Sequence, residues 1–235
     1  MTEDRARDHL AVALDTGDLE EAKAIAQAVK PSVGIAKVGL QLFSASGHTA
    51  VRAMQEIGLD VFLDVKLHDI PNTVHGASKV LGSLGVRFLT VHAAGGREML
   101  SAAVRGLREG ADSAGLPAPT VLAVTVLTSD RTAAPDVLKE RLEAAMESGC
   151  GGVVCAAPDL PVIKAVAPRI TTVVPGIRPV GVPVHDQSRV ATPTEAIRSG
   201  ADILVIGRAI TGAADKARAA EAVSTEVGRA LIAAL

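Results

Sequence analysis

The sequence predicts a single (β/α)8 barrel, a TIM-barrel α/β fold spanning residues 1–235, and three observations support this fold class. Eight short, nearly all-apolar runs recur along the chain, and segments with helical periodicity lie between them. Because the runs rarely alternate with polar residues, both faces of each strand are expected to be covered, as in a parallel sheet. Eight units give about 29 residues per unit, which is typical of this barrel.

An open, doubly wound sheet is the alternative fold. That fold often carries a glycine-rich G-x-G-x-x-G turn after its first strand, whereas the turn here reads LDTGDLEEA. No linker, low-complexity tract or block of charge divides the chain. The expected strands, in chain order, are residues 10–15, 34–40, 59–66, 86–92, 119–127, 151–157, 170–174 and 202–207.

Four segments between the strands have apolar residues at helical spacing, namely residues 18–30, 48–58, 134–149 and 192–202. The second of these ends in Gly58, a residue type typical of helix C-caps. The last opens with Thr192 and, three residues later, Glu195, which is the pattern of a capping box. Each of these signals supports alternation of helix and strand along the chain.

Composition limits the class of protein. Hydrophobic residues make up 48% of the chain, which is enough for a large core and too much for disorder. The net charge is -2 and aromatic residues are 1%, so neither an electrostatic nor a stacking surface for nucleic acid is expected. The charged N-terminus resembles no signal peptide, and no apolar stretch approaches the ~18 residues of a membrane span. We therefore expect a soluble, cytoplasmic protein with no membrane partner.

Polar side chains gather at the expected C-terminal ends of the strands, where barrel active sites form. Taken alone, Asp15 also fits a helix cap, Lys37 a structural ion pair with Asp15, and His92 a core histidine. The number of converging groups nevertheless exceeds what packing requires. They include Asp15, Lys37, Asp64, Lys66, Asp69, His92, Thr125, Thr128, Ser129, Gln187 and Arg208.

The strongest local signal is FLDVKLHDIPNTV at residues 62–74. Asp64 and Lys66 are two apart in a strand, so both side chains should face the barrel mouth, and Asp69 follows in the loop. A lysine flanked by carboxylates is held protonated, which makes it a poor Schiff-base nucleophile and a good proton donor. The two aspartates could bind a divalent metal, but Lys66 would compete for the place between them. The array favours stabilising and protonating a carbanion.

The end of the eighth strand suggests a phosphate site. Gly207 and Arg208 offer backbone N–H groups and a guanidinium, and barrels often bind phosphate after strands seven and eight. Residues 176–193 are rich in glycine and proline and are predicted to form a lid. The combined prediction is a small phosphorylated substrate with its reacting carbon near Asp64 and Lys66.

These residues resemble the orotidine 5'-monophosphate decarboxylases. The family's D-x-K-x-x-D-I-P-N-T motif is matched by DVKLHDIPNT at residues 64–73, and the likeness extends from Asp15 to Thr211. One departure is Ala209, where many members have proline; it should matter little because the Gly–Arg pair before it makes the phosphate contacts. Similar blocks are VHAAGG (91–96), VTVLTS (124–129), PGIRP (175–179), DQSRVATP (186–193) and VIGR (205–208).

The resemblance implies decarboxylation of orotidine 5'-monophosphate to UMP and CO2 by a carbon–carbon lyase, the last step of de novo UMP synthesis, with no metal or organic cofactor. Asp64 would face the substrate carboxylate, and Lys66 would stabilise and protonate the C6 carbanion. The resemblance also implies a homodimer with shared active sites, in which Asp69, Ile70 and Thr73 reach the partner subunit's site.

The same resemblance implies the remaining substrate contacts. They are Asp15 and Lys37 to the ribose hydroxyls, Thr128 to the pyrimidine, Gln187 between phosphate and base, and Arg178 with Gly207 and Arg208 to the phosphate.

Two alternatives remain open. The 3-keto-L-gulonate 6-phosphate decarboxylases and hexulose 6-phosphate synthases share D-x-K-x-x-D but depend on Mg2+, and the LTS and DQ segments argue against them. A barrel that only binds a nucleotide is the other alternative, and an intact array of Asp64, Lys66 and Asp69 argues against it. Cys150, Cys155 and His185 are given no role.

Overall fold

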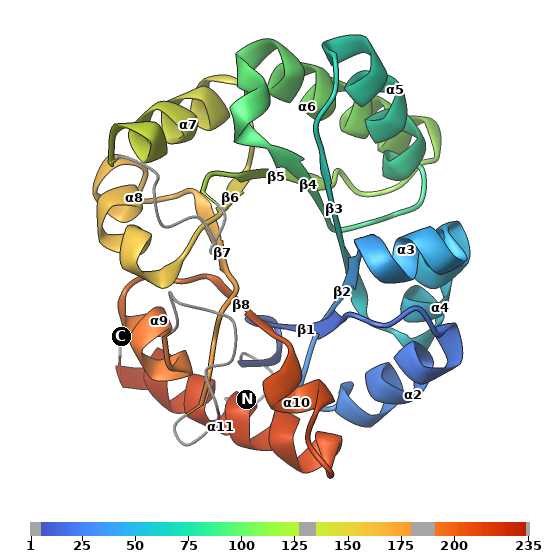
Figure 1. Ribbon diagram of the computed structural model, residues 1–235, viewed down its shortest axis with the longest axis vertical. Coiled ribbons are helices and arrows are strands. Elements are labelled where there is room, and N and C mark those ends of the chain that lie inside the picture. Colours follow the sequence, from blue (N-terminus) through green and yellow to red (C-terminus); the bar gives the residue numbers. More distant parts are fainter. Residues whose placement is uncertain (1–5, 127–134, 180–190, 234–235) are drawn as a thin grey trace.

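The computed structural model describes residues 6–126, 135–179 and 191–233 (Figure 1). Over these residues the chain forms a closed barrel of eight parallel strands in sequence order, with β8 pairing back to β1. The predicted (β/α)8 fold is confirmed, and each of the eight apolar runs coincides with a strand, although β3 extends one residue beyond its predicted run. The strands are β1 (Leu10–Leu14), β2 (Ile35–Gly39), β3 (Asp60–Leu67), β4 (Phe88–His92), β5 (Thr120–Val124), β6 (Gly152–Val154), β7 (Thr171–Val174) and β8 (Ile203–Ile206).

Helices surround the barrel as an outer ring (Figure 1). The α-helices are α2 (Leu19–Val29), α3 (Leu40–Ser46), α4 (His48–Ile57), α5 (Pro71–Gly82), α6 (Gly96–Ser113), α7 (Pro135–Glu147), α8 (Leu160–Val166), α9 (Pro193–Arg198), α10 (Arg208–Thr211) and α11 (Lys216–Ala233). Short 3-10 turns follow β4 and β6, namely η1 (Ala93–Gly95) and η2 (Ala157–Asp159). No helix among the described residues is long and apolar enough to cross a bilayer.

The local helix signals are confirmed. Gly58 caps α4 with φ 89°, a left-handed conformation that favours glycine. Thr192 accepts the N–H of Glu195, whose carboxylate accepts the N–H of Thr192, so the predicted capping box opens α9. At α2 the cap is Asp18, which accepts the N–H groups of Glu20 and Glu21. Asp15 is therefore no helix cap.

The core has two parts. A large cluster fills the space between the sheet and the helices, and a smaller one fills the barrel interior. In the interior, the rings of Phe62 and Phe88 meet edge to face at 6.1 Å between centroids. Because Ala13, Phe62 and Val205 belong to this interior cluster and also line the pocket above it, the cluster forms the pocket floor.

Helices α5 and α6 approach each other closely, and glycine permits the approach. A Cβ atom on Gly106 would overlap the backbone of His75, and one on Gly110 would overlap the carbonyl of Lys79. These contacts hold α5 in place. The start of α5 directly follows the segment that contains Asp69 and Ile70, so the packing also fixes that segment.

Candidate active site

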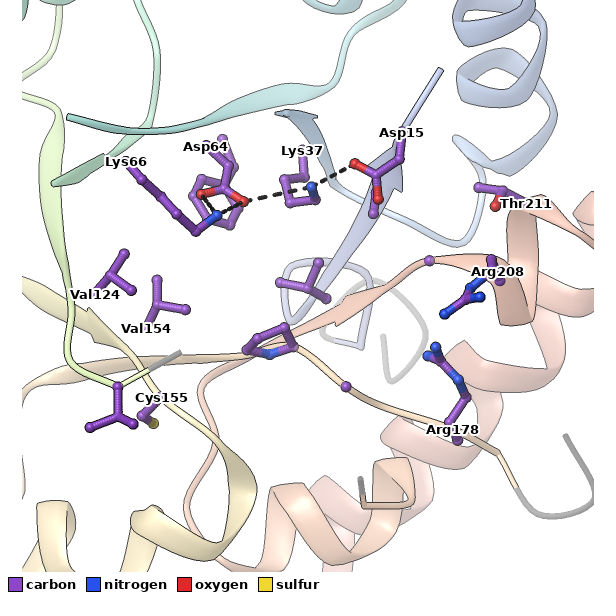
Figure 2. Close-up of a pocket in the computed structure, with 17 residues that line it drawn as sticks. Asp15, Lys37, Asp64, Lys66, Val124, Val154, Cys155, Arg178, Arg208 and Thr211 are labelled. Carbon is purple, nitrogen blue, oxygen red and sulfur yellow. Dashed lines mark hydrogen bonds and ion pairs between the residues drawn. The ribbon is translucent and has the colours of Figure 1, made fainter. Parts of the chain in front are cut away.

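A row of alternating carboxylates and lysines crosses one side of the barrel mouth (Figure 2). Lys37 Nζ lies 2.9 Å from Asp15 Oδ1 and 3.6 Å from Asp64 Oδ2. Lys66 Nζ donates to both oxygens of Asp64, each at 2.8 Å. The row follows the strand order, since Asp15 comes directly after β1, Lys37 lies on β2, and Asp64 and Lys66 lie on β3.

The lysines hold Asp64 ionised. Burial is the largest influence on its carboxyl and would raise its pKa, but the charges of Lys66 and Lys37 and the hydrogen bonds of Lys66 and Thr90 together outweigh burial. The net result is a pKa below the ordinary value for aspartate. Lys66 itself is 31% exposed at its side chain, so its ammonium reaches the pocket while remaining paired with a carboxylate.

The backbone at Lys66 departs from regular strand geometry. Lys66 has φ 47°, and among the described residues it is the one non-glycine residue with a positive φ. Such a conformation costs about 1 kcal/mol or more. The register between β3 and β4 shifts between Leu63 and Leu67, which places the irregularity around Lys66. Asp64 and Lys66 do reach the same pocket, as predicted, but the backbone of β3 is irregular at Lys66.

Thr90 supports this irregular segment. The backbone N–H of Lys66 donates to Thr90 Oγ1 at 2.9 Å, and Thr90 Oγ1 donates to Asp64 Oδ1 at 2.9 Å. Sequence reasoning did not single out this residue. Its signal is weak but present, because it is a hydroxyl within the apolar run FLTVH, two residues after the interior Phe88.

Two arginines lie at the other end of the pocket. Arg178 follows β7 and Arg208 follows β8, and Figure 2 shows their guanidinium groups directed toward each other. Arg178 is buried, and its Nη1 donates to the carbonyl of Ile177 at 2.8 Å. Two cations that face one another attract an anion into the space between them. Gly207, also predicted, lines the pocket next to Arg208.

The remaining wall is apolar. It is formed by Val124, Val126, Val154, Cys155 and Pro175, from the strand ends of β5, β6 and β7. The cavity measures about 480 Å³, which is within the size range of small-molecule sites. A ligand in this pocket would contact the acid–lysine row on one side, the two arginines at one end, and apolar side chains on the opposite side.

Cys155 thus lines the pocket, although sequence reasoning gave it no role. Cys150 is different: it is buried in the outer core, and burial raises the pKa of its thiol to about 12. Thr125 is also buried, and its hydroxyl donates to the carbonyl of Val154 at 3.0 Å, which is a structural bond. Among the residues described, no group of three or more His, Cys, Asp or Glu side chains could hold a metal ion.

Some predicted residues lie elsewhere. Asp69, Ile70 and Thr73 are exposed and do not line the pocket of their own chain. The predicted array of Asp64, Lys66 and Asp69 is therefore wrong for a single chain, because Asp69 accepts the neighbouring N–H of Ile70 while Lys66 pairs with Asp64. The second cation beside Asp64 is Lys37, a contact that depends on how β2 and β3 align.

His92 is not the satisfied core histidine that was one of its possible roles. Its ring lies 5.5 Å from that of His68, and its buried Nδ1 has no hydrogen-bond partner among the described residues. Burial, followed by the charges of His68 and Lys66, holds the pKa of His92 below its ordinary value. The predicted contacts Thr128 and Gln187, together with Ser129 and most of the expected lid, lie outside the described residues.

The fold and the pocket define a (β/α)8 barrel whose mouth combines a cationic end with an acid–lysine row, an arrangement suited to a small anionic ligand. The sequence profile of the orotidine 5'-phosphate decarboxylase / HUMPS family matches residues 8–223. The chain belongs to this family, and the resemblance seen in its motifs is confirmed.

Its relatives match over most of their length. The chain is 48% identical over 228 residues to the orotidine 5'-phosphate decarboxylase of Anaeromyxobacter sp. (strain K), covering 92% of this chain and 97% of that protein. It is 45% identical over 235 residues to the orotidine 5'-phosphate decarboxylase of Moorella thermoacetica, covering 94% of this chain and 93% of that protein. The crystal structure of orotidine 5'-phosphate decarboxylase from Lactobacillus acidophilus is similar with a TM-score of 0.80 at 34% identity, covering 93% of this chain and 98% of that one.

Proposed function

We propose that this protein decarboxylates orotidine 5'-monophosphate to UMP and CO2, the last step of UMP synthesis, without a metal or organic cofactor. The observation that carries the proposal is the pocket itself, with Lys66 and Asp64 on one side and Arg178 and Arg208 at the far end. A nucleoside monophosphate has its phosphate and its base at opposite ends, which matches this distribution of charge. Family membership supports the same substrate.

Lys66 is the proposed catalytic residue. When the bond between C6 and the carboxylate breaks, CO2 leaves and the electron pair remains on C6. Fixed positive charge beside that carbon stabilises the carbanion, and a group that is already a cation can then give C6 a proton. The ion pair with an ionised Asp64 holds the Lys66 ammonium at the pocket, where it can serve both tasks.

The other contacts of the pocket are assigned by their chemistry. Asp64 would face the substrate carboxylate. Asp15 is bound to Lys37 through one oxygen and is well exposed, so its carboxylate has acceptor capacity left for a ribose hydroxyl. Lys37 would bind a second hydroxyl. Gln187 and Thr128 belong to the proposal through the family motifs, as contacts to phosphate and base.

Arg178, Arg208 and Gly207 would bind the phosphate. Guanidinium groups match phosphate oxygens in geometry as well as charge. Because the phosphate site is remote from the reacting carbon, its binding energy can be used to order the site around C6.

We also propose that the protein works as a homodimer with shared sites. Asp69, Ile70 and Thr73 are exposed beside the mouth, and the side chain of Ile70, at 66% exposed, offers apolar surface for a partner subunit to bury. A partner subunit would cover this segment and receive Asp69 at its own site. The cytoplasmic location stays a prediction.

The ultraviolet absorbance of orotidine 5'-monophosphate, followed on adding the purified protein in EDTA, tests the reaction and its metal independence together. The chain has no Trp or Tyr, so its own near-ultraviolet background is low. A rapid fall in absorbance that Mg2+ does not accelerate is expected. No fall in EDTA, with turnover of a 3-keto-hexonate phosphate in Mg2+, would instead indicate a metal-dependent sugar-phosphate relative.

A further inference from the structure

A buried threonine links the two central groups of the proposed site. Thr90 has no exposed surface and lies on β4, facing the barrel interior one layer above Phe88. On the neighbouring strand, Asp64 lies one layer above Phe62 in the same way, and Phe62 pairs with Phe88 in the sheet. The alignment of the two strands therefore brings Thr90 and Asp64 side by side.

Both hydrogen-bonding functions of this hydroxyl are used. A threonine hydroxyl has one proton to donate and lone pairs with which to accept. Its proton goes to Asp64 Oδ1 at 2.9 Å, which requires the carboxylate to act as an acceptor. Its oxygen accepts the backbone N–H of Lys66, also at 2.9 Å. One hydroxyl thus fixes a side chain and a backbone that both determine where the Lys66 ammonium lies.

The backbone of Lys66 needs such support. Its φ of 47° is unfavourable for a lysine, and the regular pairing of β3 with β4 is interrupted there. At an interruption of this kind a backbone N–H loses its usual carbonyl partner on the next strand. The Thr90 side chain replaces that partner and so stabilises the left-handed conformation.

We propose that Thr90 is a positioning residue for the reaction, whose hydroxyl couples the left-handed backbone of Lys66 to the carboxylate of Asp64. This inference rests on the proposed function, because it assigns Thr90 a role in the same site. Thr90 does not line the pocket, and it acts through Lys66 and Asp64.

Thr172 offers a matched control. It is equally buried, lies in the same barrel sheet on β7, away from Thr90, and its hydroxyl also donates to a carboxylate, that of Asp202, at 2.8 Å. Neither residue of that pair lines the pocket. A threonine with a purely structural role should behave as Thr172 does.

The test compares Thr90→Val, Thr90→Ser and Thr172→Val by kcat and KM for orotidine 5'-monophosphate, by the Kd for UMP and by Tm. Valine keeps the shape and removes the hydroxyl, whereas serine keeps the hydroxyl. We expect Thr90→Val to lower kcat about 10- to 100-fold while KM and the Kd for UMP change less than about 3-fold. Thr90→Ser should stay within about 3-fold of the wild-type kcat, and Thr172→Val should lower Tm without lowering kcat.

Two results would overturn the inference while the wild type remains active: a kcat for Thr90→Val equal to that of Thr172→Val, or a Thr90→Ser variant as slow as Thr90→Val. Should Thr90→Val not fold, the smaller Thr90→Ala replaces it, and a folded Thr90→Ala with full kcat overturns the inference equally. A wild type that leaves orotidine 5'-monophosphate unchanged would contradict the proposed function, and the role of Thr90 with it.

Discussion

At the scale of single residues, the site depends on how charges are paired. Asp64 is nearly surrounded by groups that favour its ionised form, namely Lys37, Lys66 and the hydroxyl of Thr90. Without this carboxylate, the ammonium groups of Lys37 and Lys66 would lose the negative charge that they share. Asp64 is therefore important for the stability of the protein as well as for the proposed reaction.

Asp64→Asn should lower the free energy of unfolding by about 1–3 kcal/mol at pH 7, because charged donors lose a charged acceptor. The loss depends on pH. The folded-state pKa of Asp64 lies below its ordinary value, so its stabilisation is present above the unfolded pKa, near 3.8, and disappears as pH falls through the folded pKa. Urea denaturation between pH 7 and pH 3 should show the two proteins converging at low pH. A difference in free energy of unfolding between the two proteins that stays constant with pH would contradict the lowered pKa of Asp64.

Arg208 permits a test of the phosphate end. It is exposed, so Arg208→Ala should leave Tm nearly unchanged. We expect KM for orotidine 5'-monophosphate to rise about 10- to 100-fold, since a charged hydrogen-bond donor to phosphate is lost. Arg105→Ala, another exposed arginine on the outer helix α6, serves as the control. Unchanged steady-state kinetics for Arg208→Ala would place the phosphate elsewhere.

Asp15, Lys37, Asp64, Lys66 and Arg208 line the pocket, and they could be predicted from the sequence because each interrupts or follows an apolar run. Arg178 also lines the pocket, but it was predicted only from the resemblance to the family. Thr90 was missed because its sequence signal is weak: threonine is an ordinary strand residue, and its importance depends on which strand lies beside it.

The left-handed backbone of Lys66 escaped prediction for a similar reason. A regular strand predicts the correct face for its side chain, and nothing in the sequence marks the interrupted pairing of β3 with β4. The contact of Lys37 with Asp64 likewise depends on the alignment of β2 and β3, which the sequence does not specify.

At the scale of elements, strands were easier to predict than helices. Every apolar run coincides with a strand, since a strand buried on both faces has a composition unlike that of any loop. The long helix α6 was not among the four segments predicted from periodicity, and its glycines are unfavourable for a helix. The structure explains Gly106 and Gly110 by the carbonyl groups of α5 that pack against them.

Gly110→Ala should therefore destabilise the protein, although alanine is the better helix former. The added Cβ would overlap the carbonyl of Lys79, so we expect a loss of about 1–3 kcal/mol and a lower Tm. The control is Gly76→Ala in α5, where a Cβ meets no atom within 4 Å and should stabilise the protein by up to about 1 kcal/mol. The Tm of both variants tests this. Changes in Tm of the same sign for Gly110→Ala and Gly76→Ala would contradict the packing argument.

At the scale of the whole molecule, closure of the barrel brings together groups that are far apart in the chain. Asp15 and Arg208 lie near opposite ends of the described sequence, yet both line one pocket because β8 pairs with β1. The exposed segment that holds Asp69 and Ile70 does not line the pocket of its own chain. Its proposed place is the site of a second subunit.

Shared sites predict complementation between two inactive variants. Lys66→Ala and Asp69→Asn should each be nearly inactive as homodimers. In a heterodimer purified through two different tags, one site carries both defects and the other carries neither, so about half of the wild-type activity per dimer should return. A monomer in sedimentation, or a heterodimer without activity, would contradict the shared-site proposal.

The charge on Lys66 is the central claim, and Lys66→Ala tests it most directly through the absorbance of orotidine 5'-monophosphate in EDTA, with UMP binding measured by equilibrium dialysis. We expect kcat to fall at least about 10⁴-fold, because both the cation beside C6 and the proton donor are lost, while UMP still binds. Lys139→Ala, an exposed lysine on α7, should match the wild type. A Lys66→Ala variant that binds UMP and turns over at the wild-type rate would contradict the account.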